Sequence, residues 1–219
     1  MGRGIAPGVA AVGSHRIAEA TKDADVYVDL TSPSAAERNL PLVQREGLNL
    51  VVGTTGISKE AMERFQQGLR KTGSSAVVTP NFSIGVNVFF KACEQLARAL
   101  DGYEVEIIEL HHDQKKDAPS GTARKAAEVI SQATGVSKMV YGRHGNVGAR
   151  GEEIAIHSVR AGDVVGEHTV IFAGHKERIE LTHRAHSREA FAEGCVLAIR
   201  WVVNMHDGQV HSMNGVLGI

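Results

Sequence analysis

Apolar positions in the first half of the chain alternate between short runs and longer helical patterns. Val26–Leu30, Leu48–Val52 and Ala76–Val78 are short apolar runs rich in β-branched residues, and they predict strands. Between them, Ala35–Glu46 and the stretch from Ser58 to about Lys71 have the spacing of helices. Short connections between such elements predict a parallel sheet with right-handed crossovers.

Several residues mark the expected ends of these helices. Ser34 is expected to cap the first helix and Gly47 to end it, while Pro41 inside it should remove a backbone bond or introduce a kink. Ser58 is expected to cap the second helix, with Gly73 at its C-terminal side.

The second half of the chain has a different pattern. Gly85–Leu100 predicts an amphipathic helix with Cys93 buried, Val105–Leu110 a strand, Ala123–Gln132 a helix, and Arg188–Met205 a last long helix. The pattern predicts two interleaved units, one spanning 1–82 with about 187–219 folding back onto it, and one spanning 83–186.

Three alternating runs precede the last helix, at Ile154–Arg160, Glu167–Phe172 and Arg178–His183. Glycine-containing turns at Ala161–Asp163 and Ala173–His175 join them, which favours antiparallel pairing of successive strands. The fold class expected is α/β, with a partial Rossmann-like parallel sheet followed by an α+β unit whose sheet is mixed or antiparallel.

Composition narrows the range of functions. The chain has 219 residues, of which 42% are hydrophobic and 22% charged, with a formal net charge of −1. This balance predicts a soluble globular protein and argues against nucleic-acid or membrane partners bound through bulk charge. No apolar run approaches the roughly 18 residues of a spanning helix, Met1–Gly13 is a poor signal peptide, and Cys93 and Cys195 build no disulfide framework. We expect a cytoplasmic protein.

The densest group of residues that could take part in catalysis or ligand binding is Glu109–Thr122, between the Val105 strand and the Ala123 helix. His111 and His112 can exchange protons near neutral pH, and Lys115 adds a positive charge. Ser120-Gly121-Thr122 opens a helix, where free N–H groups favour a carboxylate or phosphate. Each part alone is consistent with a plain cap or with surface residues. Together they indicate an anionic small molecule that undergoes a proton-coupled step.

Two further turns follow predicted strands. Gly53-Thr54-Thr55-Gly56 comes after the second strand and Thr79-Pro80-Asn81-Phe82 after the third. The carboxyl edge of a parallel sheet is where such folds bind nucleotides, although either tetrapeptide alone is also consistent with an ordinary turn.

The histidines raise the possibility of a metal site. The eleven include His144, His157, His168, His183 and His186, all in the second half. The spacings HExxH and CxxC are absent from the sequence, so we predict no metal. A His-rich metal hydrolase is the less favoured alternative.

The Glu109–Thr122 region resembles the signature of the dihydrodipicolinate reductase family, through His111-His112-x-x-Lys115-x-Asp117-Ala118-Pro119-Ser120-Gly121-Thr122-Ala123. Supporting matches cover nearly the whole chain from about Asp25. They are Gly53–Gly56, Pro80–Asn87, Gly142–Gly145, Ile156–Arg160, Gly166–His168 and Glu180–Ala185.

The resemblance implies an NAD(P)H-dependent reduction of 4-hydroxy-tetrahydrodipicolinate to tetrahydrodipicolinate, in lysine and diaminopimelate biosynthesis. It implies that His111 donates or accepts a proton, that Lys115 is a second proton donor, and that the substrate carboxylates are held by His112, Ser120, Gly121 and Thr122. For the cofactor, NADPH or NADH, it implies contacts from Gly53, Thr54, Thr55, Thr79, Pro80, Asn81 and Phe82. It further implies a dinucleotide-binding unit at 1–82, a substrate-binding and oligomerisation unit at 83–186, and a homotetramer.

One departure from the family pattern concerns the glycine-rich loop of its first β-α-β unit. Gly2-Arg3-Gly4 follows Met1 with no preceding strand, so it does not match that fingerprint. We therefore expect a shortened dinucleotide-binding unit with weakened cofactor binding. The main alternative to an active reductase is a non-catalytic homologue that binds a dicarboxylate or pairs with another subunit.

Overall fold

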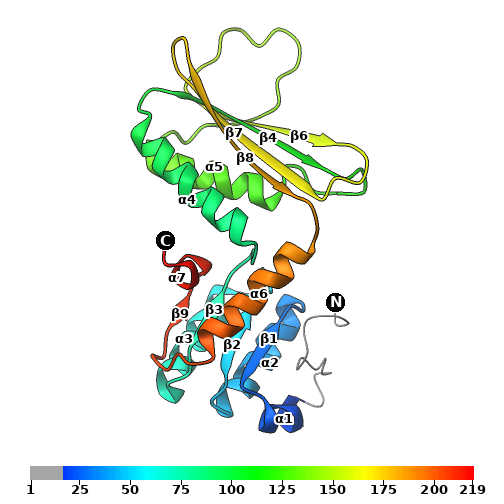
Figure 1. The fold of residues 1–219 in the computed structure, drawn as a ribbon, viewed down its shortest axis with the longest axis vertical. Coiled ribbons are helices and arrows are strands. Elements are labelled where there is room, and N and C mark those ends of the chain that lie inside the picture. Colours follow the sequence, from blue (N-terminus) through cyan, green and yellow to red (C-terminus); the bar gives the residue numbers. More distant parts are fainter. Residues whose placement is uncertain (1–16) are drawn as a thin grey trace. The chain divides into compact units, whose positions relative to one another are not determined.

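The computed structural model describes residues 17–219, which form two compact units (Figure 1). The first comprises residues 17–84 together with Glu189–Ile219, and the second is Gly85–Arg188. The expectations placed on Gly2-Arg3-Gly4 and on Met1–Gly13 fall outside the described residues. Within residues 17–219, helices long and apolar enough to cross a bilayer are absent.

A four-stranded parallel sheet forms the centre of the first unit. Its strands are β1 (Val26–Asp29), β2 (Asn49–Val52), β3 (Ala76–Val78) and β9 (Val210–His211), in that spatial order. The predicted parallel sheet is confirmed. The short strand β9 is an addition that the apolar pattern does not show.

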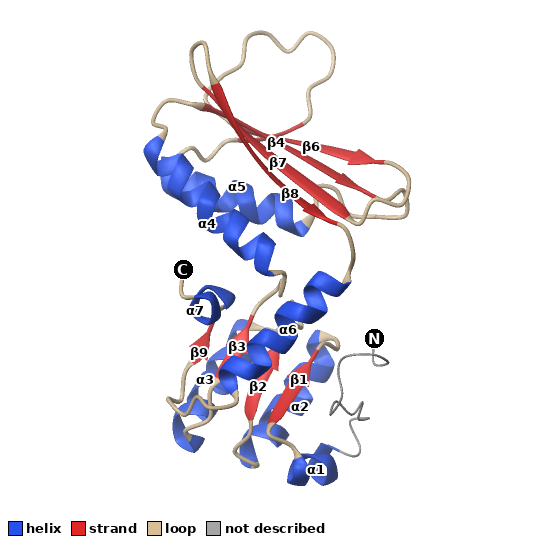
Figure 2. Ribbon diagram, viewed as in Figure 1, coloured by secondary structure: helices blue, strands red, loops and turns tan. Residues whose placement is uncertain are grey.

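Helices cover both faces of this sheet (Figure 2). Successive strand side chains point to opposite faces, so Leu50 and Val52 pack with α2 and α3, whereas Val51 packs with α6 and α7. The helices are α2 (Pro33–Arg45), α3 (Lys59–Thr72), α6 (Glu189–Val202) and α7 (Met213–Leu217), and a short α1 (Ile17–Ala20) and 3₁₀ turn η2 (Thr21–Asp23) precede β1.

One predicted cap is confirmed and another is wrong. Ser58 caps α3 by accepting a hydrogen bond from the backbone N–H of Ala61 at 3.3 Å, and Gly73 ends the helix with a φ of 76°. Helix α2, however, has Ser32 as its N-cap and Pro33 in its first turn, so Ser34 already lies inside the helix. Proline suits this first turn because its φ is already helical and its missing N–H would have no helical acceptor.

The second unit is built on a five-stranded sheet with the order β5-β6-β4-β7-β8. Helices α4 (Ile84–Ala99) and α5 (Gly121–Thr134) pack on one face of it (Figure 2). The strands are β4 (Glu104–His111), β5 (Met139–Tyr141), β6 (Ile154–Arg160), β7 (Gly166–Ala173) and β8 (Arg178–Ala185).

The expected pairing of successive strands holds for β7 with β8 but is wrong for β6 with β7. Strand β4 lies between those two, parallel to β6 and antiparallel to β7. Helix α5 is the crossover that allows β4 and β6 to run parallel, since parallel neighbours need a long connection. The sheet is therefore mixed, and β4 is its central strand.

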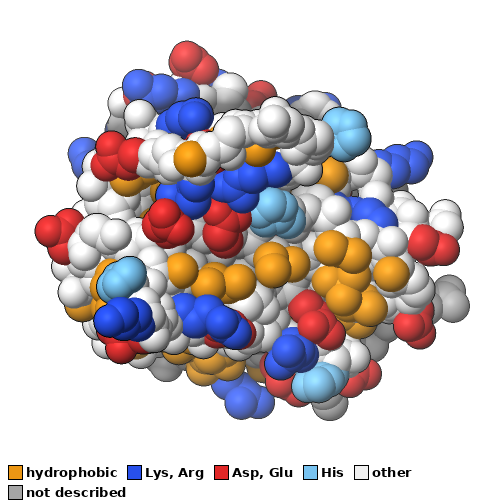
Figure 3. Space-filling view, turned by 90° about the horizontal axis from the view of Figure 1, so that it is seen from above, with side chains coloured by type: hydrophobic (Ala, Val, Ile, Leu, Met, Phe, Trp, Pro, Cys, Tyr) orange, Lys and Arg blue, Asp and Glu red, His pale blue; other side chains and the backbone are white. Residues whose placement is uncertain are grey.

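The other face of this sheet is partly apolar. Ile108 on β4 and Val159 on β6 are exposed there, beside charged side chains of the same strands. The space-filling view from above also shows solvent-exposed hydrophobic side chains among charged ones (Figure 3).

Candidate active site

The site is organised around Glu109, whose side chain is fully buried near the end of β4. Strand alternation places Val105, Ile107, Glu109 and His111 on the same face of the sheet, and all four are buried. The apolar members of this row belong to the core of the unit, while the polar pair lies at the carboxyl end of the strand.

Glu109 is held by a cation and by backbone. The guanidinium of Arg160 donates to both carboxylate oxygens, with Nη1–Oε2 at 3.0 Å and Nη2–Oε1 at 2.7 Å. The backbone N–H of Ser120 donates to Oε1 at 3.2 Å. Burial acts to raise the pKa of Glu109, but hydrogen bonds from Arg160, Ser158 and His111 outweigh it and lower the pKa. The carboxylate is therefore ionised at neutral pH.

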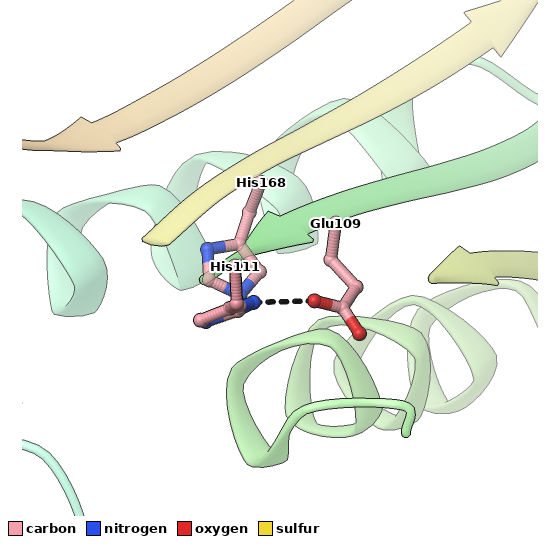
Figure 4. A group of neighbouring side chains, drawn as sticks. All are labelled: Glu109, His111 and His168. Carbon is pink, nitrogen blue, oxygen red and sulfur yellow. Dashed lines mark hydrogen bonds and ion pairs between the residues drawn. The ribbon is translucent and has the colours of Figure 1, made fainter. Parts of the chain in front are cut away.

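His111 is the next inward-facing residue on β4, and its Nδ1 is hydrogen-bonded to Oε2 of Glu109 (Figure 4). Burial lowers the pKa of His111; Glu109 opposes this, while Lys115 and Arg160 add to it. A neutral ring donates from Nδ1 to the carboxylate, which leaves Nε2 as an acceptor. Gly166 on β7 gives this ring its space, since a Cβ there would lie 3.0 Å from Nε2.

Ser120 begins α5 and joins the helix to the histidines. Its Oγ accepts a hydrogen bond from the backbone N–H of Ala123 at 3.1 Å and lies 3.0 Å from Nε2 of His168. Gly121 and Thr122 follow in the first turn of the helix, where backbone N–H groups have no helical acceptor. The positive end of the helix dipole is therefore within the same site.

Lys115 lies in the loop between β4 and α5, with its side chain 20% exposed and its Nζ 2.7 Å from Oδ1 of Asp117. The hydrogen bond from Lys115 lowers the pKa of Asp117. His112 is half-buried, and its backbone N–H donates to the carbonyl of Val164 at 2.7 Å. Lys115 therefore lies close enough to His111 to affect its charge, whereas the hydrogen bond of His112 to Val164 is made by its backbone.

Glu109, His111 and His168 are close enough for one metal ion to be considered, with potential ligand atoms within 4.8 Å of one another. Their arrangement favours a proton-handling cluster instead. Nδ1 of His111 is bonded to Glu109, and Arg160 occupies both carboxylate oxygens. A dication at this place would also meet the guanidinium charge.

The carboxyl edge of the first sheet carries the second group of predicted residues. The Oγ1 of Thr54 donates to Oδ1 of the buried Asp29 at 2.6 Å and accepts from the N–H of Thr31 at 2.9 Å. Gly53 is packed so closely that a Cβ would lie 2.6 Å from both Leu30 and Phe82. The backbone here is fixed by contacts, and Thr55 and Gly56 beyond it are exposed.

The turn after β3 is held in a similar way. The Oγ1 of Thr79 donates to the carbonyl of Asn81 at 2.8 Å, and Oδ1 of Asn81 accepts from the N–H of Ser83 at 2.9 Å. Pro80 is exposed, whereas Phe82 is buried in the core beneath α6, where Gly194 allows close approach to its carbonyl.

Comparison with known proteins matches both units to one family. Residues 3–82 match the family model described as dihydrodipicolinate reductase, N-terminus, and residues 85–217 match dihydrodipicolinate reductase, C-terminus. The chain belongs to the dihydrodipicolinate reductase family.

Relatives in this family include proteins named 4-hydroxy-tetrahydrodipicolinate reductase. The one from Methanosarcina barkeri is 50% identical over 196 residues, covering 90% of this chain and 74% of the relative. The one from Methanobrevibacter smithii is 47% identical over 218 residues, covering 97% and 80%. A solved structure, dipicolinate-bound dihydrodipicolinate reductase from Paenisporosarcina sp. TG-14, has a TM-score of 0.74 and 30% identity over 88% of this chain and 73% of its own.

Within this family member, the structure brings together part of the predicted set and adds three residues to it. His111, Lys115 and Ser120 belong to one group on the second unit. Glu109, Arg160 and His168 complete that group, although the sequence assigned no role to the first two and considered His168 only as a metal ligand. Strand alternation is the sequence signal for Glu109, which lies two residues before His111 on β4. Arg160 and His168 are brought to the site by the strand register, which places Arg160 opposite His111 and His168 opposite Glu109.

Proposed function

We propose that this protein catalyses the NAD(P)H-dependent reduction of 4-hydroxy-tetrahydrodipicolinate to tetrahydrodipicolinate, in lysine and diaminopimelate biosynthesis. The observation that carries the proposal is the buried Glu109–His111 pair beside Lys115 and the N-terminus of α5. Identity of about half to relatives named for this reaction supports the same conclusion.

The substrate is a ring with two carboxylates, and the second unit offers matching groups. We assign the carboxylates to His112, Ser120, Gly121 and Thr122. Unpaired N–H groups at the start of α5 and the positive end of its dipole favour carboxylate binding. Lys115 adds a full charge close to the same turn, which increases the attraction for a dianion.

We assign the proton transfers of the reaction to side chains of this protein. The 4-hydroxyl group of the substrate would leave as water, and a reduced nicotinamide, when bound, would supply a hydride to an electron-poor ring carbon, so that negative charge develops on a neighbouring atom. Lys115 donates a proton to that atom, and His111 accepts or donates a second proton through Nε2. Glu109 orients His111 through Nδ1, and Arg160 keeps Glu109 ionised.

For the cofactor we assign the carboxyl edge of the first sheet, with contacts from Gly53, Thr54, Thr55, Thr79, Pro80, Asn81 and Phe82. Parallel sheets of this kind bind nucleotides at this edge. The close packing of Gly53 and the fixed hydroxyls of Thr54 and Thr79 support a preformed backbone surface there. Both NADPH and NADH are compatible with these residues.

We also assign two properties of the whole protein. The exposed apolar residues on the outer face of the mixed sheet support association of this face with further copies, and we propose a homotetramer. The two buried free cysteines are compatible with a reducing compartment, and we propose the cytoplasm.

The test combines binding and turnover. Titration of the protein with NADPH and with NADH, followed by nicotinamide fluorescence, should give saturable binding for at least one of them. Addition of 4-hydroxy-tetrahydrodipicolinate should then oxidise the bound cofactor, measured by loss of nicotinamide absorbance.

Other results would identify the rival functions. Dicarboxylate binding without saturable cofactor binding would indicate a non-catalytic homologue. Stoichiometric zinc in elemental analysis, with activity lost on chelation, would indicate a metal hydrolase built on Glu109, His111 and His168.

A further inference from the structure

The Ser120 hydroxyl is buried and already has two neighbours. Its oxygen accepts the N–H of Ala123 at 3.1 Å, as the cap of α5, and lies 3.0 Å from Nε2 of His168. Ser120 is 2% exposed and His168 is 4% exposed. The direction of the Ser120–His168 hydrogen bond therefore decides what the hydroxyl can still offer to a ligand.

The two directions have opposite consequences. A serine hydroxyl has one hydrogen to donate and two lone pairs to accept with. If Nε2 of His168 has no proton, the Ser120 hydroxyl donates its only hydrogen to Nε2 and has none left to donate to a ligand. If Nε2 carries the proton, it donates to Ser120 Oγ, both lone pairs are filled, and the hydroxyl hydrogen remains for an anion.

The surroundings of His168 favour the second direction. Its Nδ1 is buried and has no hydrogen-bond partner. A buried N–H without an acceptor is more costly than a buried lone pair without a donor, so the ring keeps its single proton on Nε2. The ring is neutral, because burial and then the neighbouring His111 lower the pKa of His168 to about 3.

The position of His168 is also fixed. It lies opposite Glu109 in the β4–β7 register. The His111 ring meets it edge-on, with centroids 5.1 Å apart and the planes at 76° (Figure 4). Its opposite neighbour on β8 is His183. His168 is thus flanked by residues of β4 and β8, and its Nε2 faces Oγ of Ser120.

We propose that His168 is a positioning residue, which donates from Nε2 to Ser120 and so directs the Ser120 hydroxyl hydrogen at a carboxylate of the substrate. The inference rests on the proposed function, because that function assigns Ser120 to substrate binding. It explains why a histidine, rather than an apolar residue, lies in this part of the core.

The first test reads the tautomer directly. Long-range ¹H–¹⁵N correlation spectra of the ¹⁵N-histidine-labelled protein distinguish protonation at Nε2 from protonation at Nδ1. We expect His168 to be neutral at pH 7 with its proton on Nε2, identified by the loss of its signals in the His168→Gln variant. A proton on Nδ1 of His168 would overturn the proposal.

The second test is a double-mutant cycle on binding of dipicolinate, measured by calorimetry. Ser120→Ala should raise the Kd about 10-fold or more, as expected for a hydrogen bond to a charged group. His168→Leu should raise it by a similar factor, and the double variant should be no weaker than Ser120→Ala alone. His168→Gln, whose amide can donate from nearly the same place as Nε2, should stay within about threefold of wild type.

The outcomes separate this inference from the proposed function. Unchanged dipicolinate binding in Ser120→Ala would remove the substrate assignment itself. Weakened binding in Ser120→Ala together with unchanged binding in His168→Leu, or strictly additive effects, would overturn only the role of His168.

Discussion

Arg160 on β6 forms a two-point ion pair with Glu109 on β4, whose carboxylate is completely buried. The pair connects two parallel strands beneath the start of α5, and the same carboxylate holds the ring of His111. Stability of the second unit and orientation of the proposed proton-transfer residue therefore depend on the same contact.

Arg160→Met should destabilise the protein by about 3 kcal/mol or more, because it leaves a buried carboxylate without its cation. Urea unfolding measures this change. Arg184→Met is the matched control, since its ion pair with Glu167 is largely exposed and should cost less than about 1 kcal/mol. Equal effects of the two substitutions would show that the Arg160 pair has no special importance.

Lys115→Ala should lower kcat by about 10²-fold or more, the usual contribution of a general acid. The thermal midpoint should be nearly unchanged, because the Lys115–Asp117 pair lies in a surface loop. Lys116→Ala, at the neighbouring exposed lysine, should keep wild-type kinetics. Unchanged kinetics in Lys115→Ala would mean that another group supplies the proton.

His111→Gln should reduce kcat more than it changes KM, because a group that acts mainly in the transition state adds little to ground-state binding. Steady-state kinetics give both parameters. His175→Gln, in the exposed turn between β7 and β8, is the control and should leave both unchanged. A rise in KM with constant kcat would assign His111 to binding.

Gly166→Ala should lower kcat/KM about 10-fold, roughly 1.4 kcal/mol of transition-state stabilisation, because the new Cβ would lie 3.0 Å from Nε2 of His111 and displace the ring. Gly151→Ala is the control, since the nearest side-chain atom to its Cβ lies 4.0 Å away. The kinetic loss should exceed any change in thermal midpoint. A variant with wild-type kcat/KM would show that His111 tolerates the shift.

Unfolding free energy should fall as the pH drops from 6.5 towards 4.5. The pKa of His168 is about 3 in the folded protein against an ordinary value of 6.5, so only the unfolded chain takes up this proton in that interval. His111 and His183, whose pKa values burial also lowers, act in the same direction. Stability is therefore complete above pH 6.5 and is lost as the pH falls.

The contribution of His168 can be isolated with His168→Gln, which has no proton to gain. Its slope of unfolding free energy against pH should be smaller than that of wild type by up to about 1.4 kcal/mol per pH unit. Urea unfolding at several pH values above 4.5, the ordinary pKa of glutamate, keeps carboxylate titration from dominating. Identical slopes would indicate that His168 is protonated in the folded protein.

Local sequence patterns were sufficient for most of the elements. The apolar runs predicted β1 to β3, and Ser58 and Gly73 marked the ends of α3 because a serine cap and a left-handed glycine act within one turn of the chain. The same reasoning placed the cap of α2 at Ser34, but Pro33 lies in the first turn of the helix and Ser32 is its N-cap.

The sequence predicted only those residues of the candidate site that lie close together in the chain. Glu109–Thr122 could be recognised as a candidate site because two imidazoles, a lysine and the start of a helix fall within one strand-to-helix connection. Arg160 and His168 lie 51 and 59 residues beyond Glu109 in the chain, and no local pattern connects them to Glu109.

By itself the sequence determined most of the strands and helices, the parallel sheet of the first unit and the family signature, because these depend on periodicity and short spacings. Only the tertiary structure decided that β4 lies between β6 and β7. That strand order brings Arg160 to one side of Glu109 and His168 to the other. Strand order depends on long-range packing and crossover connections, which short spacings do not encode.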